Sequence, residues 1–120
     1  MDSSNSDPAL FAGQILSQEG KFAEGIPLLK YAMIHNPGDY QPFDKLSYAY
    51  FRTGDFSNSI AVNKIAISKL PPQTAPYVNI ARVFIEQSQI DSARTYLVKA
   101  SAINASDPSV QQLIKSIEGK

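Results

Sequence analysis

The chain has 120 residues, of which 43% are hydrophobic, and it carries 11 basic and 11 acidic side chains. This composition fits one folded domain rather than a disordered chain, and a net charge of zero argues against general nucleic-acid binding. Because the chain contains no cysteine, disulfides, thiolate metal sites and a cysteine nucleophile are excluded.

The chain begins with a polar stretch, MDSSNSD, which lacks the basic and apolar regions of a signal peptide. We expect residues 1–5 to form a flexible tail. Further along, no apolar run approaches the roughly 18 residues that a membrane helix needs. The sequence therefore favours a cytoplasmic protein without membrane insertion, and the chain could equally be a fragment of a larger protein.

An internal repeat appears when the sequence is shifted by 34 residues against itself. Three blocks then align, namely Ser6–Asp39, Tyr40–Gln73 and Thr74–Asp107. Small residues fall on small residues and large apolar residues on large ones, in the columns Gly13/Ser47/Ala81, Gly25/Ser59/Ala93, Ala32/Ala66/Ala100, Leu16/Tyr50/Phe84 and Phe22/Phe56/Ile90. Agreement in this many columns at one shift indicates a true structural repeat.

Each block is predicted to contain two helices, because its apolar residues recur at helical rather than strand spacing. Gly20 and Gly54 stand where a helix can end in the left-handed conformation, and Ser88 takes this place in the third block. Asp55 and the pair Asp107-Pro108 are typical helix starts. The predicted helices cover residues 8–18, 22–35, 41–52, 56–69, 75–87, 91–103 and 108–118.

The repeated unit is similar to a tetratricopeptide repeat (TPR). It shares the 34-residue helix-turn-helix length, the small residues at fixed contacts, the aromatic residue after the mid-block turn and the closing proline, Pro37 or Pro71. The resemblance covers three repeats, 6–39, 40–73 and 74–107, with residues 108–120 as a capping helix. It implies an all-α, right-handed superhelical solenoid of antiparallel helix pairs, with about seven helices.

The chain departs from the repeat pattern at a few positions. In the third copy Ser88 replaces the turn glycine and Ala105 the proline, and Asn63 occupies a column that holds Leu29 and Leu97 in the other copies. We expect these departures to weaken packing locally. The closing helix shows an apolar stripe suited to covering the last repeat, formed by Val110, Leu113, Ile114 and Ile117.

A candidate binding site follows from the resemblance, since TPR proteins bind peptides in a concave groove lined by the first helix of each repeat. In the second block, Phe43, Leu46, Ser47 and Tyr50 form the core stripe of that helix. The other face is rich in aromatic residues and arginine, which are enriched at binding hot spots. The predicted groove residues are Gln14, Asp44, Lys45, Tyr48, Phe51, Arg52, Asn79, Arg82 and Ile85.

Two alternatives limit this prediction. Phe51 and Ile85 could instead pack against each other between adjacent helices, with Tyr48 shielding them. The groove positions also do not match the clamp with which some TPR proteins hold the terminal carboxylate of heat-shock chaperones, which argues against that ligand. Arg52 and Arg82 could still bind a different acidic group.

Catalysis is not indicated by any motif. The single histidine, His35, lies at a predicted helix end, where a positive charge is favourable, and no second histidine or cysteine accompanies it. The acidic residues are scattered, and no Gly-Lys-Ser/Thr phosphate loop occurs. We therefore expect neither an enzyme nor a bound metal or cofactor.

The function that we predict is a non-catalytic adaptor, with a protein or peptide partner held in the groove. One alternative is a scaffold or oligomerisation module that uses the convex face and shows weak self-association, with Tyr31, Ile34, Ile65, Ile67 and Tyr96 as the residues concerned. Another is a chaperone or assembly factor for a secretion system or a multiprotein complex.

Overall fold

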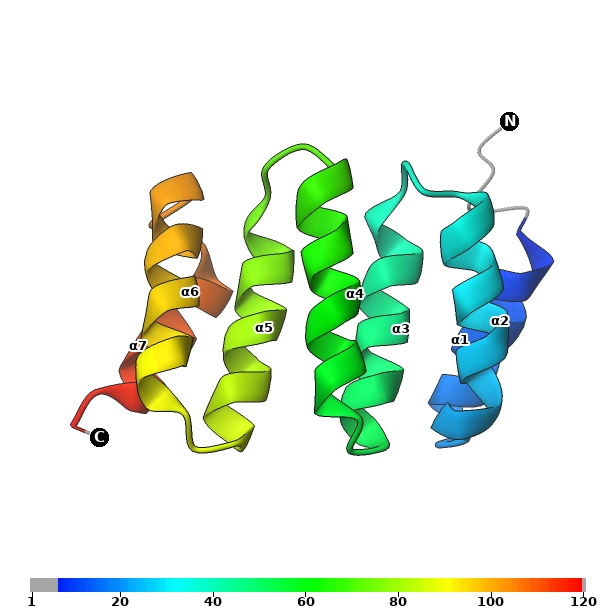
Figure 1. The fold of residues 1–120 in the computed structure, drawn as a ribbon, viewed down its shortest axis with the longest axis horizontal. Coiled ribbons are helices and arrows are strands. Elements are labelled where there is room, and N and C mark those ends of the chain that lie inside the picture. The colour runs from blue at the N-terminus through cyan, green and yellow to red at the C-terminus, as the bar shows by residue number, and fades with distance from the viewer. Residues whose placement is uncertain (1–6, 120) are drawn as a thin grey trace. The chain divides into compact units, whose positions relative to one another are not determined.

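The computed structural model describes residues 7–119, and within that range its regular structure is helical throughout (Figure 1). The helices are α1 (Pro8–Gln18), α2 (Phe22–His35), α3 (Tyr40–Arg52), α4 (Phe56–Lys69), α5 (Thr74–Glu86), α6 (Ile90–Ile103) and α7 (Pro108–Ile117). The all-α prediction is confirmed, and every predicted helix end lies within one residue of the observed one. The predicted tail, residues 1–5, lies outside the described residues.

The described chain forms two compact units, one ending at Leu70 and the other beginning at Pro71. In the first unit α1 packs on α2, α2 on α3, and α3 on α4, and consecutive helices run in opposite directions (Figure 1). In the second unit α5 packs on α6, and α7 contacts both of them. Within residues 7–119, no helix is long and apolar enough to cross a membrane.

Aspartate side chains start several of these helices. Asp7 accepts hydrogen bonds from the backbone N–H groups of Ala9 and Leu10, and Asp55 accepts one from Asn58. These bonds satisfy donors that have no partner inside the helix. Asp107 likewise accepts a hydrogen bond from the backbone N–H of Ser109, so the helix starts predicted at Asp55 and Asp107 are confirmed.

The turn inside each helix pair contains one residue in the left-handed region. Gly20 has a φ of 78°, Gly54 of 83° and Ser88 of 60°. The third turn thus adopts the same backbone conformation as the first two, although it lacks the glycine that adopts it without strain.

The small-residue columns mark the places where paired helices come closest. A Cβ atom added to Gly13 would lie 2.7 Å from Cδ2 of Leu29, and one added to Gly25 would lie 3.2 Å from the carbonyl oxygen of Gly13. In the second pair, Ser47 and Ser59 occupy these columns and are buried, with their Oγ atoms 3.0 Å apart. Close packing of α1 on α2 thus depends on glycine at Gly13, whereas a Cβ at Gly25 would make a tight contact.

Asn63 corrects one expectation from the sequence. It is fully buried, but its side chain is not a packing defect. Its Oδ1 accepts a hydrogen bond from Tyr40 Oη at 2.9 Å, and its Nδ2 donates to the Ser59 carbonyl oxygen at 3.1 Å and to Ser47 Oγ. A hydrogen-bonded network therefore replaces the leucine contact of the other copies, as a buried polar group requires.

Helix α7 covers the apolar core of the second unit. Val110 and Ile117 are buried, and Leu113 and Ile114 pack against the same core residues. Its start is tied to α5, because the Thr74 hydroxyl donates a hydrogen bond to the Asp107 carboxylate. That bond, followed by the backbone N–H groups of Ser109 and Val110, lowers the pKa of Asp107 below its ordinary value of 3.8.

Candidate functional site

An aromatic–arginine cluster lies in the first unit and is formed by Phe22, Tyr48 and Arg52. The rings of Phe22 and Tyr48 meet edge to face with centroids 5.7 Å apart. The Arg52 guanidinium lies 4.8 Å from the Phe22 ring centroid and 5.8 Å from that of Tyr48. Its Nη1 also donates a hydrogen bond to Tyr48 Oη at 2.9 Å.

This cluster is open to solvent. The Tyr48 side chain is 49% exposed, and Arg52 is exposed as well, whereas Phe22 is half-buried against the core of the unit. Cation–π contacts of this kind hold an arginine in place without using up most of its N–H donors. The arrangement is a partly preorganised surface with one fixed cation and two aromatic rings.

Four other predicted groove residues lie in the first unit, namely Gln14, Asp44, Lys45 and Phe51. All are half-buried. Phe51 packs on Phe56 at the start of α4, with ring centroids 5.7 Å apart, so it has an aromatic partner within its own unit. Phe51 thus has a packing contact within the first unit, which does not test the predicted contact with Ile85 of the second unit.

The second unit contains the remaining predicted residues, Asn79, Arg82 and Ile85, all on α5. Arg82 is exposed, and its Nη1 donates a hydrogen bond to Asn79 Oδ1 at 3.3 Å. Ile85 is half-buried and packs against the core that contains Ala81 and Leu97. Arg82 is therefore the residue of this set that presents its charged group most openly.

Phe22 is a site residue that the repeat pattern did not reveal. It shares a column with Phe56 and Ile90, which suggested a core position. In the structure its ring forms the base beneath Arg52 and Tyr48. A column comparison cannot detect this, because the Arg52 column holds Gln18 and Glu86 in the other copies, and neither side chain can make a cation–π contact.

The five residues predicted for a convex scaffold surface differ in exposure. Tyr31, Ile34 and Ile65 are exposed, whereas Ile67 and Tyr96 are half-buried. Tyr31 stacks on His35 with ring centroids 3.8 Å apart, and His35 Nδ1 lies 2.9 Å from the Tyr31 carbonyl oxygen. His35 thus has a local role at the end of α2, as its position in the sequence suggested. Within residues 7–119 no cluster of three or more potential metal ligands occurs.

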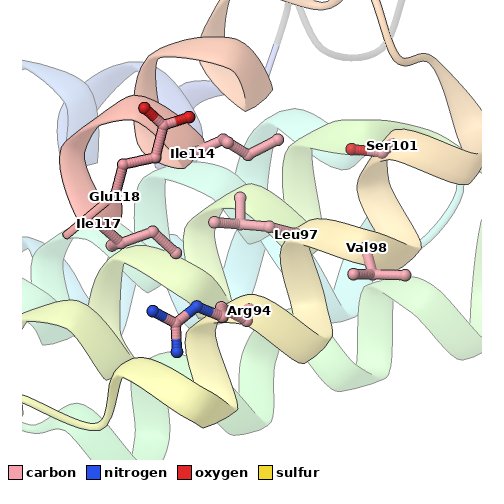
Figure 2. Close-up of a pocket in the computed structure, with 7 residues that line it drawn as sticks. All are labelled: Arg94, Leu97, Val98, Ser101, Ile114, Ile117 and Glu118. Carbon is pink, nitrogen blue, oxygen red and sulfur yellow. The ribbon is translucent and has the colours of Figure 1, made fainter. Parts of the chain in front are cut away.

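An open, mostly apolar pocket of about 380 Å³ lies between α6 and α7 in the second unit (Figure 2). We call it the α6–α7 pocket. Its floor is aliphatic, and Arg94 and Glu118 bring charged groups to it; Arg94 also forms an ion pair with Asp91 at 2.8 Å. The residues that line it are Arg94, Leu97, Val98, Ser101, Ile114, Ile117 and Glu118.

The sequence contains a signal for this pocket. Val98 is 69% exposed, and it falls in the column where the other copies have Lys30 and Lys64. A surface column that changes from lysine to valine in one copy marks a locally apolar surface.

Comparison with known proteins supports the fold. No protein-family model matches the sequence, and no curated protein is similar enough to count as a relative. Among solved structures, the type III secretion translocator chaperone SycD of Yersinia enterocolitica matches with a TM-score of 0.81 and 13% identity, over 98% of this chain and 84% of SycD. The first TPR domain of human RPAP3 matches with a TM-score of 0.74 and 16% identity, over 90% and 91% of the two chains.

A tetratricopeptide repeat protein from Parabacteroides merdae also matches, with a TM-score of 0.70 and 18% identity, over 89% of this chain and 42% of that protein. At these identities the likeness concerns the fold. The predicted resemblance is confirmed at that level: the chain has a TPR-like helical-repeat fold, and the seven helices found within residues 7–119 fit three repeats and a closing helix.

Proposed function

We propose that this protein is an interaction module that binds a peptide or protein segment on the first-helix faces, with the aromatic–arginine cluster as its main contact. The single observation that carries this proposal is the solvent-exposed stacking of Arg52 on Phe22 and Tyr48. The TPR-like fold supports it, since TPR domains are interaction modules.

The cluster fits a partner segment that contains a carboxylate next to an apolar side chain. Among the described residues, Arg52 forms a hydrogen bond with Tyr48 and has no carboxylate partner. A guanidinium can bind a carboxylate through two parallel N–H donors. The exposed edges of Phe22 and Tyr48 would contact an adjacent aliphatic or aromatic side chain of the partner.

A displayed random-peptide library, selected against the purified protein, tests this function. Affinities of selected peptides would then be measured by fluorescence anisotropy for the wild type, for Arg52→Ala and for Tyr48→Ala. Hot-spot residues cost 2 kcal/mol or more on truncation, so we expect losses of about 30-fold or greater. Arg52→Lys should recover little, because lysine lacks the planar fork that binds two oxygens.

Tyr31→Ala is the matched control, since Tyr31 is an exposed tyrosine of the same unit on α2. It should leave the affinities unchanged, and melting curves should show that every variant is folded. If Tyr31→Ala abolishes binding and the cluster variants do not, the groove proposal is wrong and the scaffold alternative is favoured.

A chaperone role is the second candidate, and the match to a translocator chaperone over 98% of this chain favours it. The same library separates the two functions. An adaptor should select a shared motif with an acidic residue, whereas a chaperone should select varied apolar segments. Unrelated selected sequences that bind equally well to Arg52→Ala would favour the chaperone.

A further inference from the structure

The solvent-exposed residues of α1 form a single narrow strip, which we call the α1 seam. Of the eleven residues of this helix, Pro8, Phe11, Ile15 and Gln18 are exposed, and the others are buried or half-buried. Their spacing is three, four and three residues, which is the spacing of a coiled-coil seam. Its two central side chains are apolar, with Phe11 65% and Ile15 40% exposed.

The repeat explains which surface of the helix this is. Pro8 and Ile15 fall in the columns of Pro42 and Ala49, both of which are buried in α3. Helix α3 packs on α2, the second helix of the preceding block, and Ala49 belongs to the resulting core. The other two seam residues, Phe11 and Gln18, fall in the columns of Lys45, which is half-buried, and Arg52, which is exposed. The edge of the α1 seam that contains Pro8 and Ile15 is thus the part that the next block of the unit buries. Among the described residues of the unit, α1 packs on α2 and touches α3.

The absence of charge on α1 sets it apart from the other terminal helix. Residues 8–18 include no acidic or basic side chain. Helix α7 instead carries the exposed Lys115 in its last turn and is followed by the exposed Glu118, as expected for a helix that closes an array towards water. A charge-free seam favours an equally uncharged partner surface, because no charge is left buried and unpaired.

We propose that the α1 seam binds the same seam of a second copy of this chain, with the two helices antiparallel. The spacing is self-complementary about Gly13. Phe11 then lies opposite Ile15 of the second copy, and Pro8 lies opposite Gln18 of the second copy. A two-fold axis through the middle of the seam reproduces both pairs, as a closed dimer requires. A single short helix buries less area than a standard stable interface, so the dimer is weak and depends on concentration.

Introducing opposite charges at Phe11 and Ile15 tests both whether the α1 seam forms the dimer interface and whether the two helices pair antiparallel. Sedimentation velocity from about 10 µM to about 1 mM should show the wild type passing from monomer to dimer. Phe11→Lys and Ile15→Glu should each remain monomeric at the highest concentration. An equimolar mixture of the two should form a heterodimer, since Lys at 11 then lies opposite Glu at 15. The double variant F11K/I15E should dimerise with itself for the same reason.

The matched control is Ile34→Glu, which adds the same charge at an exposed isoleucine on α2. It should dimerise like the wild type. The proposal is overturned if the wild type stays monomeric throughout, if Ile34→Glu removes association, or if Phe11→Lys associates as the wild type does. Association of the wild type without rescue in the mixture would exclude the antiparallel pairing. Peptide binding through Arg52 is measured independently, so failure here leaves the proposed function standing.

Discussion

At the scale of single residues, Ser88 shows where this chain tolerates strain. Its φ of 60° lies in the region that Gly20 and Gly54 occupy in the other turns. A non-glycine residue in the left-handed conformation costs about 1 kcal/mol or more. Replacing it with glycine removes this cost, but glycine also has more conformational freedom in the unfolded chain, which lowers the net gain in stability. We expect Ser88→Gly to stabilise the fold by about 0.5–1 kcal/mol, measured by urea unfolding.

The reciprocal change and a helical serine serve as controls for this prediction. Gly54→Ser should destabilise the protein, because it places a Cβ at a φ of 83°. Ser57→Gly, at the exposed second position of α4, should also destabilise it, by less than about 0.5 kcal/mol. A destabilising effect of Ser88→Gly would mean that the serine side chain supports the turn in a way that its backbone conformation does not suggest.

Some residue contacts could be predicted from the sequence and others could not. The small-residue columns were predictable, since only glycine fits between α1 and α2 at Gly13. The network around Asn63 was not, because its partner Tyr40 comes from a helix start 23 residues earlier and falls in no apolar column. A leucine-to-asparagine change looks like a packing defect until the hydrogen-bond partners can be seen.

At the scale of elements, helix ends were predictable because local chemistry determines them. Aspartate caps, prolines in first turns and left-handed turn residues act within a few positions of the chain. Which side chains of neighbouring helices meet was less predictable. Phe22 was assigned to the core by its column, and it does pack on the core of the first unit, but its ring also lies beneath Arg52.

The start of α7 yields a prediction about acid stability. The Thr74 hydroxyl is the main cause of the lowered pKa of Asp107. A group whose pKa is lower in the folded state adds stability above its unfolded value near 3.8, and this contribution is lost as the pH falls through the folded pKa. We therefore expect Thr74→Val to destabilise the protein at pH 7 and the difference from wild type to shrink below about pH 4.

Denaturant melts of both proteins at several pH values between about 2.5 and 7 would measure this effect. Thr95→Val provides the control, because the Thr95 hydroxyl donates to the carbonyl oxygen of Asp91 and to no carboxylate. Its effect should not vary with pH. An equal difference between Thr74→Val and wild type at pH 3 and pH 7 would contradict the proposed linkage.

At the scale of the whole molecule, α7 is what completes the second unit. Removal of α7 would expose to water the residues that pack against Val110 and Ile117, including Leu97 and Ala100. Burial of each large aliphatic side chain contributes about 1.5–3 kcal/mol, so the loss of Val110 and Ile117 alone approaches the total stability of a small domain. A chain ending at Ser106 should therefore lose cooperative folding of α5 and α6.

Amide hydrogen exchange can locate this loss, because it reports protection helix by helix. We expect the shortened chain to lose protection in α5 and α6 and to retain it in α1–α4, which form a core of their own. A chain ending at Glu118 is the matched control and should behave like the full chain, since it retains the whole of α7. Unchanged protection of α5 and α6 after truncation at Ser106 would show that α7 is dispensable. Its apolar stripe would then be a candidate contact for a partner instead of part of the core.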